Sequence, residues 1–138
     1  MPGPVSRGRF VWYDLMTPDP DSDYEMAFSF YNELFGWEKT EEMDMGEMGI
    51  YQMFGPESDV GFSYGGMFNR SPEMPDHSFW LYYIMVPDMD VAVTLVKENG
   101  GKILNGPMEV PGGDVIAQCM DPQGAAFALH TRNASTTE

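Results

Sequence analysis

The chain has 138 residues, the usual size of one domain, and 43% of them are hydrophobic, which is typical of a globular protein. With 22 acidic and 7 basic residues its formal charge is −15, which repels nucleic-acid phosphates and anionic membranes and argues against both as partners. No apolar run approaches the ~20 residues that cross a bilayer, and a single cysteine, Cys119, excludes an internal disulfide and a cysteine-based zinc module.

The first ten residues, MPGPVSRGRF, contain two arginines but no apolar core of the kind that a signal peptide needs. This predicts a cytoplasmic location. Alternation predicts a strand over residues 10–16, with Trp12, Asp14 and Met16 on one face, before TPDPDSD interrupts it.

A helix is predicted in DSDYEMAFSFYNELFGW, where Gly36 marks the end. Its expected buried face contains residues at i, i+3, i+4 and i+7, namely Ala27, Phe30, Tyr31 and Leu34. Three strand-like pieces separated by the turn signals MGEMG and GPESD complete the first half: residues 37–45, 49–55 and 60–68.

The second half repeats this pattern. FWLYYIMVPD predicts a strand that ends in proline and aspartate, as the first strand does. A helix is expected in DMDVAVTLVKENGG, with Ala92, Leu95 and Val96 on one face and a glycine pair as its stop. Three further strands are expected in KILNGPMEVPG, DVIAQCMD and AAFALHT.

The order of elements therefore predicts an α+β chain of two tandem βαβββ units, over about residues 9–69 and 77–131, within one domain spanning residues 1–138. Each unit buries only one face of its sheet against its own helix. We expect the two mixed sheets to curl around a shared interior, which forms a central cleft.

In this order, FVWYDLMTPD and FYNELFGWE in the first unit and VPDMDVAV, NGGKILNGPMEVPGG and DPQGAAFAL in the second resemble the vicinal oxygen chelate superfamily. This superfamily includes glyoxalase I, bleomycin resistance proteins and extradiol dioxygenases, and the resemblance covers about residues 9–131. The pattern looks most like the glyoxalase-like hydroxylase group. The resemblance implies the two-unit fold already predicted and a binding site in its cleft.

Enzymes of this superfamily usually hold a divalent metal with one His, Gln or Glu from each of four strands. The resemblance puts these positions at Trp12, Leu81 and Ala128, and the fourth in GFSYGGMF, none of which supplies a suitable ligand. We therefore expect no metal and no other cofactor. The only two histidines, His77 and His130, are interpreted as surface or strand-end residues.

If Trp12 faces the cleft, period-two geometry also places Asp14 there. The same alternation places Leu81, Tyr83 and Met85 on the interior face of the fifth strand. A one-residue bulge would instead direct Trp80 and Tyr82 into the cleft. The candidate ligand-binding residues are aromatic, acidic or amide side chains of the cleft strands: Trp12, Asp14, Gln52, Trp80, Tyr83 and Gln118.

Asp14 has two interpretations. As a structural residue it accepts hydrogen bonds from the backbone or from Arg9, because a buried acid normally keeps a partner. As a functional residue it anchors an amine or acts as a general base. Trp12 and Tyr83 also have two interpretations: they pack in the core, or they stack on a flat or cationic ligand.

Three functions follow from these features. The first is a metal-free protein that binds a small aromatic or cationic molecule, comparable to bleomycin sequestration. The second is a glyoxalase-like lyase, isomerase or dioxygenase-type enzyme that is metal-independent or has relocated ligands. The third is a dimeric interaction module, and in each case a homodimer is expected.

Overall fold

The computed structural model describes residues 7–17, 20–58, 61–69, 74 and 76–133. Contacts divide the chain into two compact units: an N-terminal unit, Trp12–Leu81, and a C-terminal unit, Met1–Val11 with Tyr82–Glu138. The elements from the first strand onward are β1 (Phe10–Thr17), α1 (Pro20–Phe35), β2 (Glu38–Asp44), β3 (Ile50–Gly55) and β4 (Gly65–Asn69). They are followed by β5 (Phe79–Met85), α2 (Met89–Glu98), β6 (Lys102–Glu109), β7 (Val115–Met120) and β8 (Ala126–Thr131).

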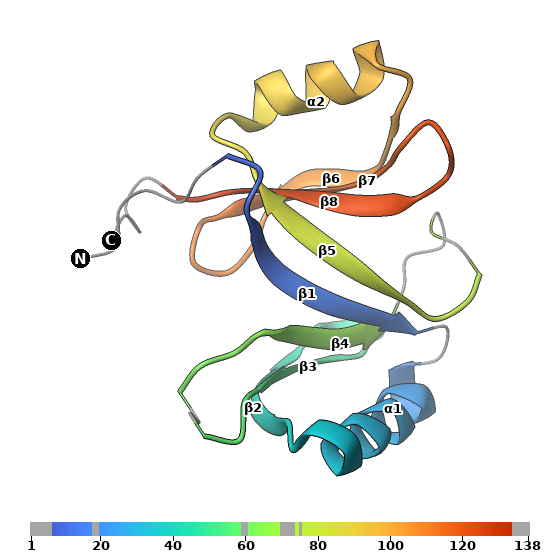
Figure 1. Ribbon diagram of the computed structural model, residues 1–138, viewed down its shortest axis with the longest axis vertical. Coiled ribbons are helices and arrows are strands. Elements are labelled where there is room, and N and C mark those ends of the chain that lie inside the picture. Colours follow the sequence, from blue (N-terminus) through green and yellow to red (C-terminus); the bar gives the residue numbers. More distant parts are fainter. Residues whose placement is uncertain (1–6, 18–19, 59–60, 70–73, 75, 134–138) are drawn as a thin grey trace. The chain divides into compact units, whose positions relative to one another are not determined.

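The two halves have the same strand order, β2-β3-β4-β1 and β6-β7-β8-β5. In each, the first and last strands pair in parallel and the remaining neighbours pair antiparallel. Figure 1 shows α1 lying along β2 to β4 and α2 along β6 to β8. The predicted α+β fold with repeated βαβββ units is confirmed. Strand β4 begins at Gly65, later than the predicted residue 60.

Aromatic side chains fill the space between α1 and its sheet. Leu15, Phe54 and Met67 form the buried core there. Partly buried side chains pack against them: Ala27, Phe28, Tyr31, Trp37, Tyr64 and Trp80. This core fixes the faces of the sheet, because Leu15 pairs with Met67 while its neighbour Asp14 pairs with Gly66 and points to the other side.

The predicted buried face of α1 is wrong at two positions. Phe30 and Leu34 are 58% and 57% exposed, whereas Phe28 and Tyr31 contact the core. The helix has large apolar residues on opposite sides, so periodicity alone does not identify the side that meets the sheet. The prediction is also wrong for Leu95 on α2, which is 43% exposed.

The core beneath α2 is mostly aliphatic. Its buried members come from the helix and from β7 and β8: Met89, Ala92, Ala117, Cys119 and Leu129. Burial raises the pKa of the Cys119 thiol to about 11, because the thiolate would lose its hydration. Cys119 is therefore a protonated core residue at neutral pH.

The DPQG segment between β7 and β8 is held by its aspartate. Asp121 Oδ1 accepts hydrogen bonds from the backbone N–H groups of Gln123 and Ala125, each at 2.9 Å. The Ala125 N–H, the largest contributor, and the Gln123 N–H lower the pKa of Asp121, because they stabilise its ionised form. The DPQG segment therefore forms a turn that Asp121 stabilises.

Asp88 begins α2 as its N-cap, accepting a hydrogen bond from the Val91 backbone N–H at 3.1 Å. Asp88→Ala should lower the free energy of unfolding by about 1 kcal/mol, because that N–H loses its acceptor. Thermal unfolding followed by circular dichroism measures this loss. Asp90→Ala, which removes a nearby acid that is not the cap, should cost only about 0.3 kcal/mol. An equal loss in both variants would contradict the capping role.

Candidate functional site

A buried carboxylate on the face of β1 opposite α1 is the most organised polar group of the N-terminal unit. Asp14 is 4% exposed. Its Oδ1 accepts hydrogen bonds from the Trp12 indole at 2.9 Å, the Tyr51 hydroxyl at 2.7 Å and the Gly66 backbone N–H at 3.0 Å. The Trp12 indole also donates to the Tyr51 hydroxyl oxygen at 2.7 Å, so the three side chains form a closed triangle.

Each member of this triangle is placed by the sheet. Trp12 and Asp14 are two residues apart on β1 and therefore share a face. Met53 pairs with Gly66, which puts Tyr51, two residues before Met53, on the same face. A side chain at position 66 would collide with the Tyr51 ring, so glycine permits tyrosine to lie across β4 and reach Asp14.

The predicted residues Gln52 and Trp80 lie on the other face. Gln52 pairs with the core residue Met67, is 3% exposed, and donates to the backbone oxygens of Glu41 and Met53 at 3.0 Å. Trp80 packs in the core under α1, with its ring edge-on to Tyr31 at 5.5 Å. The structure therefore does not bring these two residues to Asp14.

Tyr83 and Gln118 form a second polar cluster, in the C-terminal unit. The Gln118 amide donates to the Tyr83 hydroxyl at 3.1 Å, and Asn105 donates to the Gln118 amide oxygen at 3.2 Å. Both Tyr83 and Gln118 pair with Ala128, on the face of the sheet opposite α2. In β5 it is Leu81, Tyr83 and Met85 that are buried, whereas Tyr82 is 42% exposed.

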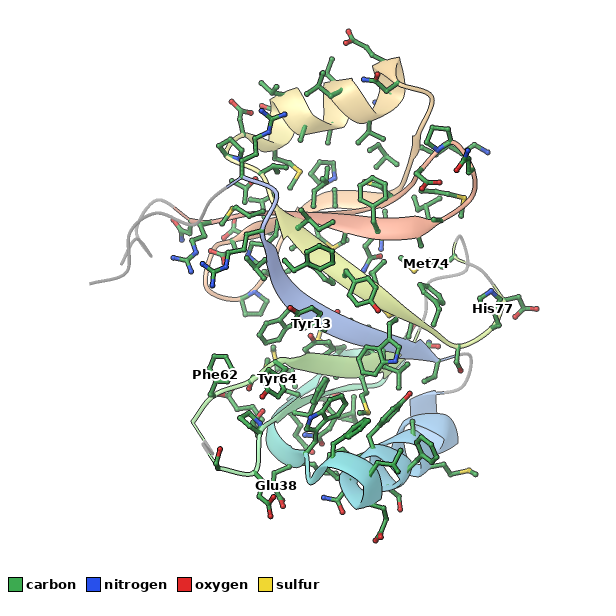
Figure 2. All side chains as sticks on the ribbon, in the orientation of Figure 1. Tyr13, Glu38, Phe62, Tyr64, Met74 and His77 are labelled. Carbon is green, nitrogen blue, oxygen red and sulfur yellow. The ribbon has the colours of Figure 1, made fainter. Side chains whose placement is uncertain are left out.

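His130 lies on the same face as Ala128, at the end of β8. Its Nε2 is 2.8 Å from Asp114 Oδ2, and Asp114 Oδ1 accepts from the Asn133 backbone N–H at 2.7 Å. Within the described chain the His130 Nδ1 is buried and has no hydrogen-bond partner. His77, in contrast, is exposed in the loop before β5, where Figure 2 shows its side chain directed away from the strands.

The residues present do not fit the divalent metal that the resemblance implies. The indole of Trp12 offers an N–H donor and no lone pair, and the side chains of Leu81 and Ala128 have no ligating atom. Among the residues that the structure describes, no three His, Cys, Asp or Glu side chains gather closely enough to hold a metal ion.

Two of the residues that donate hydrogen bonds to Asp14, Tyr51 and Gly66, were not predicted from the sequence. They lie 37 and 52 positions from Asp14, so no local pattern connects them. The sequence did contain one signal for this contact, the glycines at positions 65 and 66. Glycine within a strand often marks a place where another group approaches the backbone closely.

Comparison with known proteins identifies relatives across most of the chain. The anthracycline biosynthesis protein DnrV of Streptomyces peucetius is 31% identical over 134 residues, which cover 88% of this chain and 46% of DnrV. A glyoxylase-like domain-containing protein of Didymella fabae is 30% identical over 116 residues, covering 82% of this chain and 88% of the relative. The chain spans about half the length of curated relatives such as DnrV.

Solved structures agree on the fold. A glyoxalase/bleomycin resistance protein/dioxygenase superfamily member from Vibrio splendidus superimposes with a TM-score of 0.57 at 13% identity, covering 90% of this chain and 97% of that one. A Mn(II)-bound glyoxalase from Novosphingobium aromaticivorans gives a TM-score of 0.57 at 16% identity, over 92% of this chain and 40% of that one. At such identities the likeness concerns the fold alone.

Within the described residues, neither helix combines the length and apolar character that a bilayer crossing demands. The sequence profile of the Glyoxalase/Bleomycin resistance protein/Dioxygenase superfamily matches residues 20–129, which is most of the chain and both helices. With the repeated βαβββ units and the relatives above, this match shows that the chain belongs to that superfamily.

Proposed function

We propose that this protein is a metal-independent member of the superfamily that binds a small aromatic or cationic molecule beside Trp12, Tyr51 and Asp14. The observation that supports this most strongly is the Asp14 carboxylate, which is 4% exposed and held by three donors among aromatic rings. Such fixed geometry reduces the ordering cost of binding, because the acceptor is already oriented before a ligand arrives.

A cationic ligand suits the chemistry of this cluster. The indole, the phenol and the backbone N–H are neutral donors that orient the carboxyl group of Asp14. The Trp12 and Tyr51 rings add faces that attract cations, and Phe68 lies edge-on to Tyr51 at 5.5 Å. The formal charge of −15 attracts cations to the whole molecule.

The proposal omits a metal because the positions at which the resemblance places the family's ligands hold Trp12, Leu81 and Ala128, whose side chains are not suitable ligands. Protein purified without chelator should contain well under one equivalent of metal by elemental analysis. About one tightly held Ni, Zn, Fe or Mn per chain would contradict a metal-independent site.

Two probes of similar shape test the ligand class: 1-methylquinolinium, which is cationic, and 1-methylnaphthalene, which is neutral. We expect the cation to bind about tenfold more tightly by isothermal titration calorimetry, because it gains the Asp14 charge and the cation–π contact. Asp14→Asn should remove this preference and leave the neutral affinity unchanged. Asp90→Asn makes the same charge change on α2 and is the matched control.

Equal affinity of the folded wild-type protein for both probes would contradict a cation site. A loss of preference in Asp90→Asn as large as in Asp14→Asn would assign the effect to overall charge instead of to Asp14. Circular dichroism of each variant establishes that it is folded before its affinity is compared.

An enzyme that uses Asp14 as a general base is the second candidate. A lactoylglutathione lyase of Arabidopsis thaliana is 29% identical over 119 residues, covering 80% of this chain and 41% of the relative. In this case the protein should convert the hemithioacetal of methylglyoxal and glutathione without added metal, and Asp14→Asn should abolish turnover. Absence of turnover in wild-type protein that binds the cationic probe would favour binding over catalysis.

A further inference from the structure

One ring nitrogen of His130 has no hydrogen-bond partner among the residues that the structure describes. This atom, Nδ1, is buried. Leaving a buried polar atom unpaired costs roughly 1–3 kcal/mol, so such an atom in a folded protein requires an explanation. Either an ordered water or a ligand would supply the missing hydrogen bond.

The contact with Asp114 determines which hydrogen-bonding role is left to Nδ1. The His130 Nε2 lies 2.8 Å from Asp114 Oδ2. The other oxygen of Asp114 accepts from the Asn133 backbone N–H at 2.7 Å. A carboxylate has only lone pairs to offer, so the hydrogen between the two side chains belongs to Nε2. In the neutral imidazole the lone pair is then on Nδ1, which is an acceptor and needs a donor.

The cross-strand neighbours of His130 are apolar. Met85 on β5 and Ile116 on β7 pair with it and share its face of the sheet. The Tyr83 ring stands edge-on to the imidazole, with the ring centres 6.4 Å apart. A buried water typically makes about three hydrogen bonds, and neither Met85 nor Ile116 offers a strong one. A ligand that combines one donor with an apolar body suits these neighbours better than a water does.

We propose that His130 is the hydrogen-bond acceptor of a second ligand site, in the C-terminal unit, which binds a small neutral phenol. The phenol O–H donates to Nδ1 and is a stronger donor than the O–H of an alkyl alcohol. The flat ring packs against the Tyr83 ring and against the sulfur of Met85. Met85 has three rotatable side-chain bonds, so it can turn to admit the ring. The inference does not depend on a ligand at Asp14.

Two probes of similar shape test this role: p-cresol, which can donate a hydrogen bond, and 4-methylanisole, which can only accept one. The wild-type protein should bind p-cresol about tenfold more tightly by isothermal titration calorimetry, because only p-cresol satisfies Nδ1. His130→Gln should remove this preference. Its amide nitrogen takes the place of Nε2 beside Asp114, but no atom takes the place of Nδ1.

His77→Gln and Asp14→Asn are the matched controls. His77 is the only other histidine of the sequence, so the first variant makes the same exchange at an exposed loop position. The second removes a carboxylate that could also accept from a phenol. Both variants should keep the preference for p-cresol. Three results would overturn the proposal: equal affinity of the wild-type protein for both probes, a preference that survives in His130→Gln, or one that disappears in either control.

Asp114→Asn tests the role of Nδ1 without changing His130. The Asn oxygen can keep the hydrogen bond from the Asn133 backbone N–H, which places its amide NH₂ beside Nε2. Nε2 then becomes the acceptor, and the ring hydrogen moves to Nδ1. Both probes can accept from an Nδ1–H, so their affinities should become similar. An unchanged preference for p-cresol would overturn the assignment of Asp114 as the residue that positions the imidazole.

Two-bond proton–nitrogen correlation spectra report on Nδ1 directly, with His77 as an internal reference. When the ring is neutral, the His130 Nδ1 of the free protein should give the signal of an unprotonated nitrogen. Addition of p-cresol should shift this signal towards that of a protonated nitrogen, and 4-methylanisole should not. Absence of a shift with p-cresol would mean that an ordered water alone contacts Nδ1, which would overturn the proposal.

Discussion

Gly65→Ala should lower the free energy of unfolding by more than about 3 kcal/mol, the upper part of the range for overpacked positions. A Cβ atom at position 65 would overlap the carbonyl oxygen of Tyr13 on the neighbouring strand. Tyr13 and Gly65 are Cα partners in the parallel β1–β4 pair, and Figure 2 shows Tyr13 and Tyr64 where these strands meet. The atom in the way belongs to the backbone and has no rotamer that relieves the clash.

Chemical denaturation of the two neighbouring glycine variants tests this reasoning. Gly66→Ala should be less damaging than Gly65→Ala, because its Cβ meets the side chain of Tyr51, which can rotate away. That rotation breaks the hydrogen bond from Tyr51 to Asp14, so Gly66→Ala should reduce ligand affinity more than its stability loss alone implies. Equal stability losses in the two variants would contradict the distinction between backbone and side chain.

Asp14→Ala should destabilise the protein by about 3 kcal/mol, because the Tyr51 hydroxyl and the Gly66 N–H lose Asp14 as their acceptor in a site with little access to water. The Trp12 indole keeps the Tyr51 hydroxyl oxygen as an acceptor. Asp14→Asn keeps one acceptor oxygen of similar shape and should cost about 1 kcal/mol. The free energy of unfolding in urea measures both.

A double-mutant cycle with Tyr51→Phe identifies the coupled pair. If the phenol and the carboxylate act together, the losses from Asp14→Ala and Tyr51→Phe should add to more than the loss in the double variant, by about 1 kcal/mol. Additive losses would mean that Asp14 is held independently of Tyr51. Thr94→Ala, on the exposed surface of α2, is the control expected to be additive with Asp14→Ala.

Sequence periodicity was sufficient to predict which residues of β1 share a face. Its alternation assigned Trp12 and Asp14 to one face, and the structure places both there, opposite the core residue Leu15. In β5 both faces are apolar, and only packing reveals that Leu81 and Tyr83 are buried while Tyr82 is exposed. The boundaries of the single domain and the cytoplasmic location stay predictions.

Long-range contacts explain what sequence reasoning could not supply. Gln52 and Gln118 both stand in central strands, but strand register sends Gln52 to the α1 side and Gln118 to the face opposite α2. Register depends on pairing between distant segments, and a shift by one residue exchanges the faces. Tyr51 could not be predicted for the same reason, because its role depends on strand pairing that brings it across β4 to Asp14.

The contact between Tyr51 and Gly66 has a consequence for how this protein diverges. Any larger residue at position 66 removes the space that the Tyr51 ring occupies. A sequence that loses this glycine forces the tyrosine ring to rotate away from Asp14, and one that keeps the ring against Asp14 must keep the glycine. In descendants of this chain the two positions should therefore change together, and the identity of one residue should forecast that of the other.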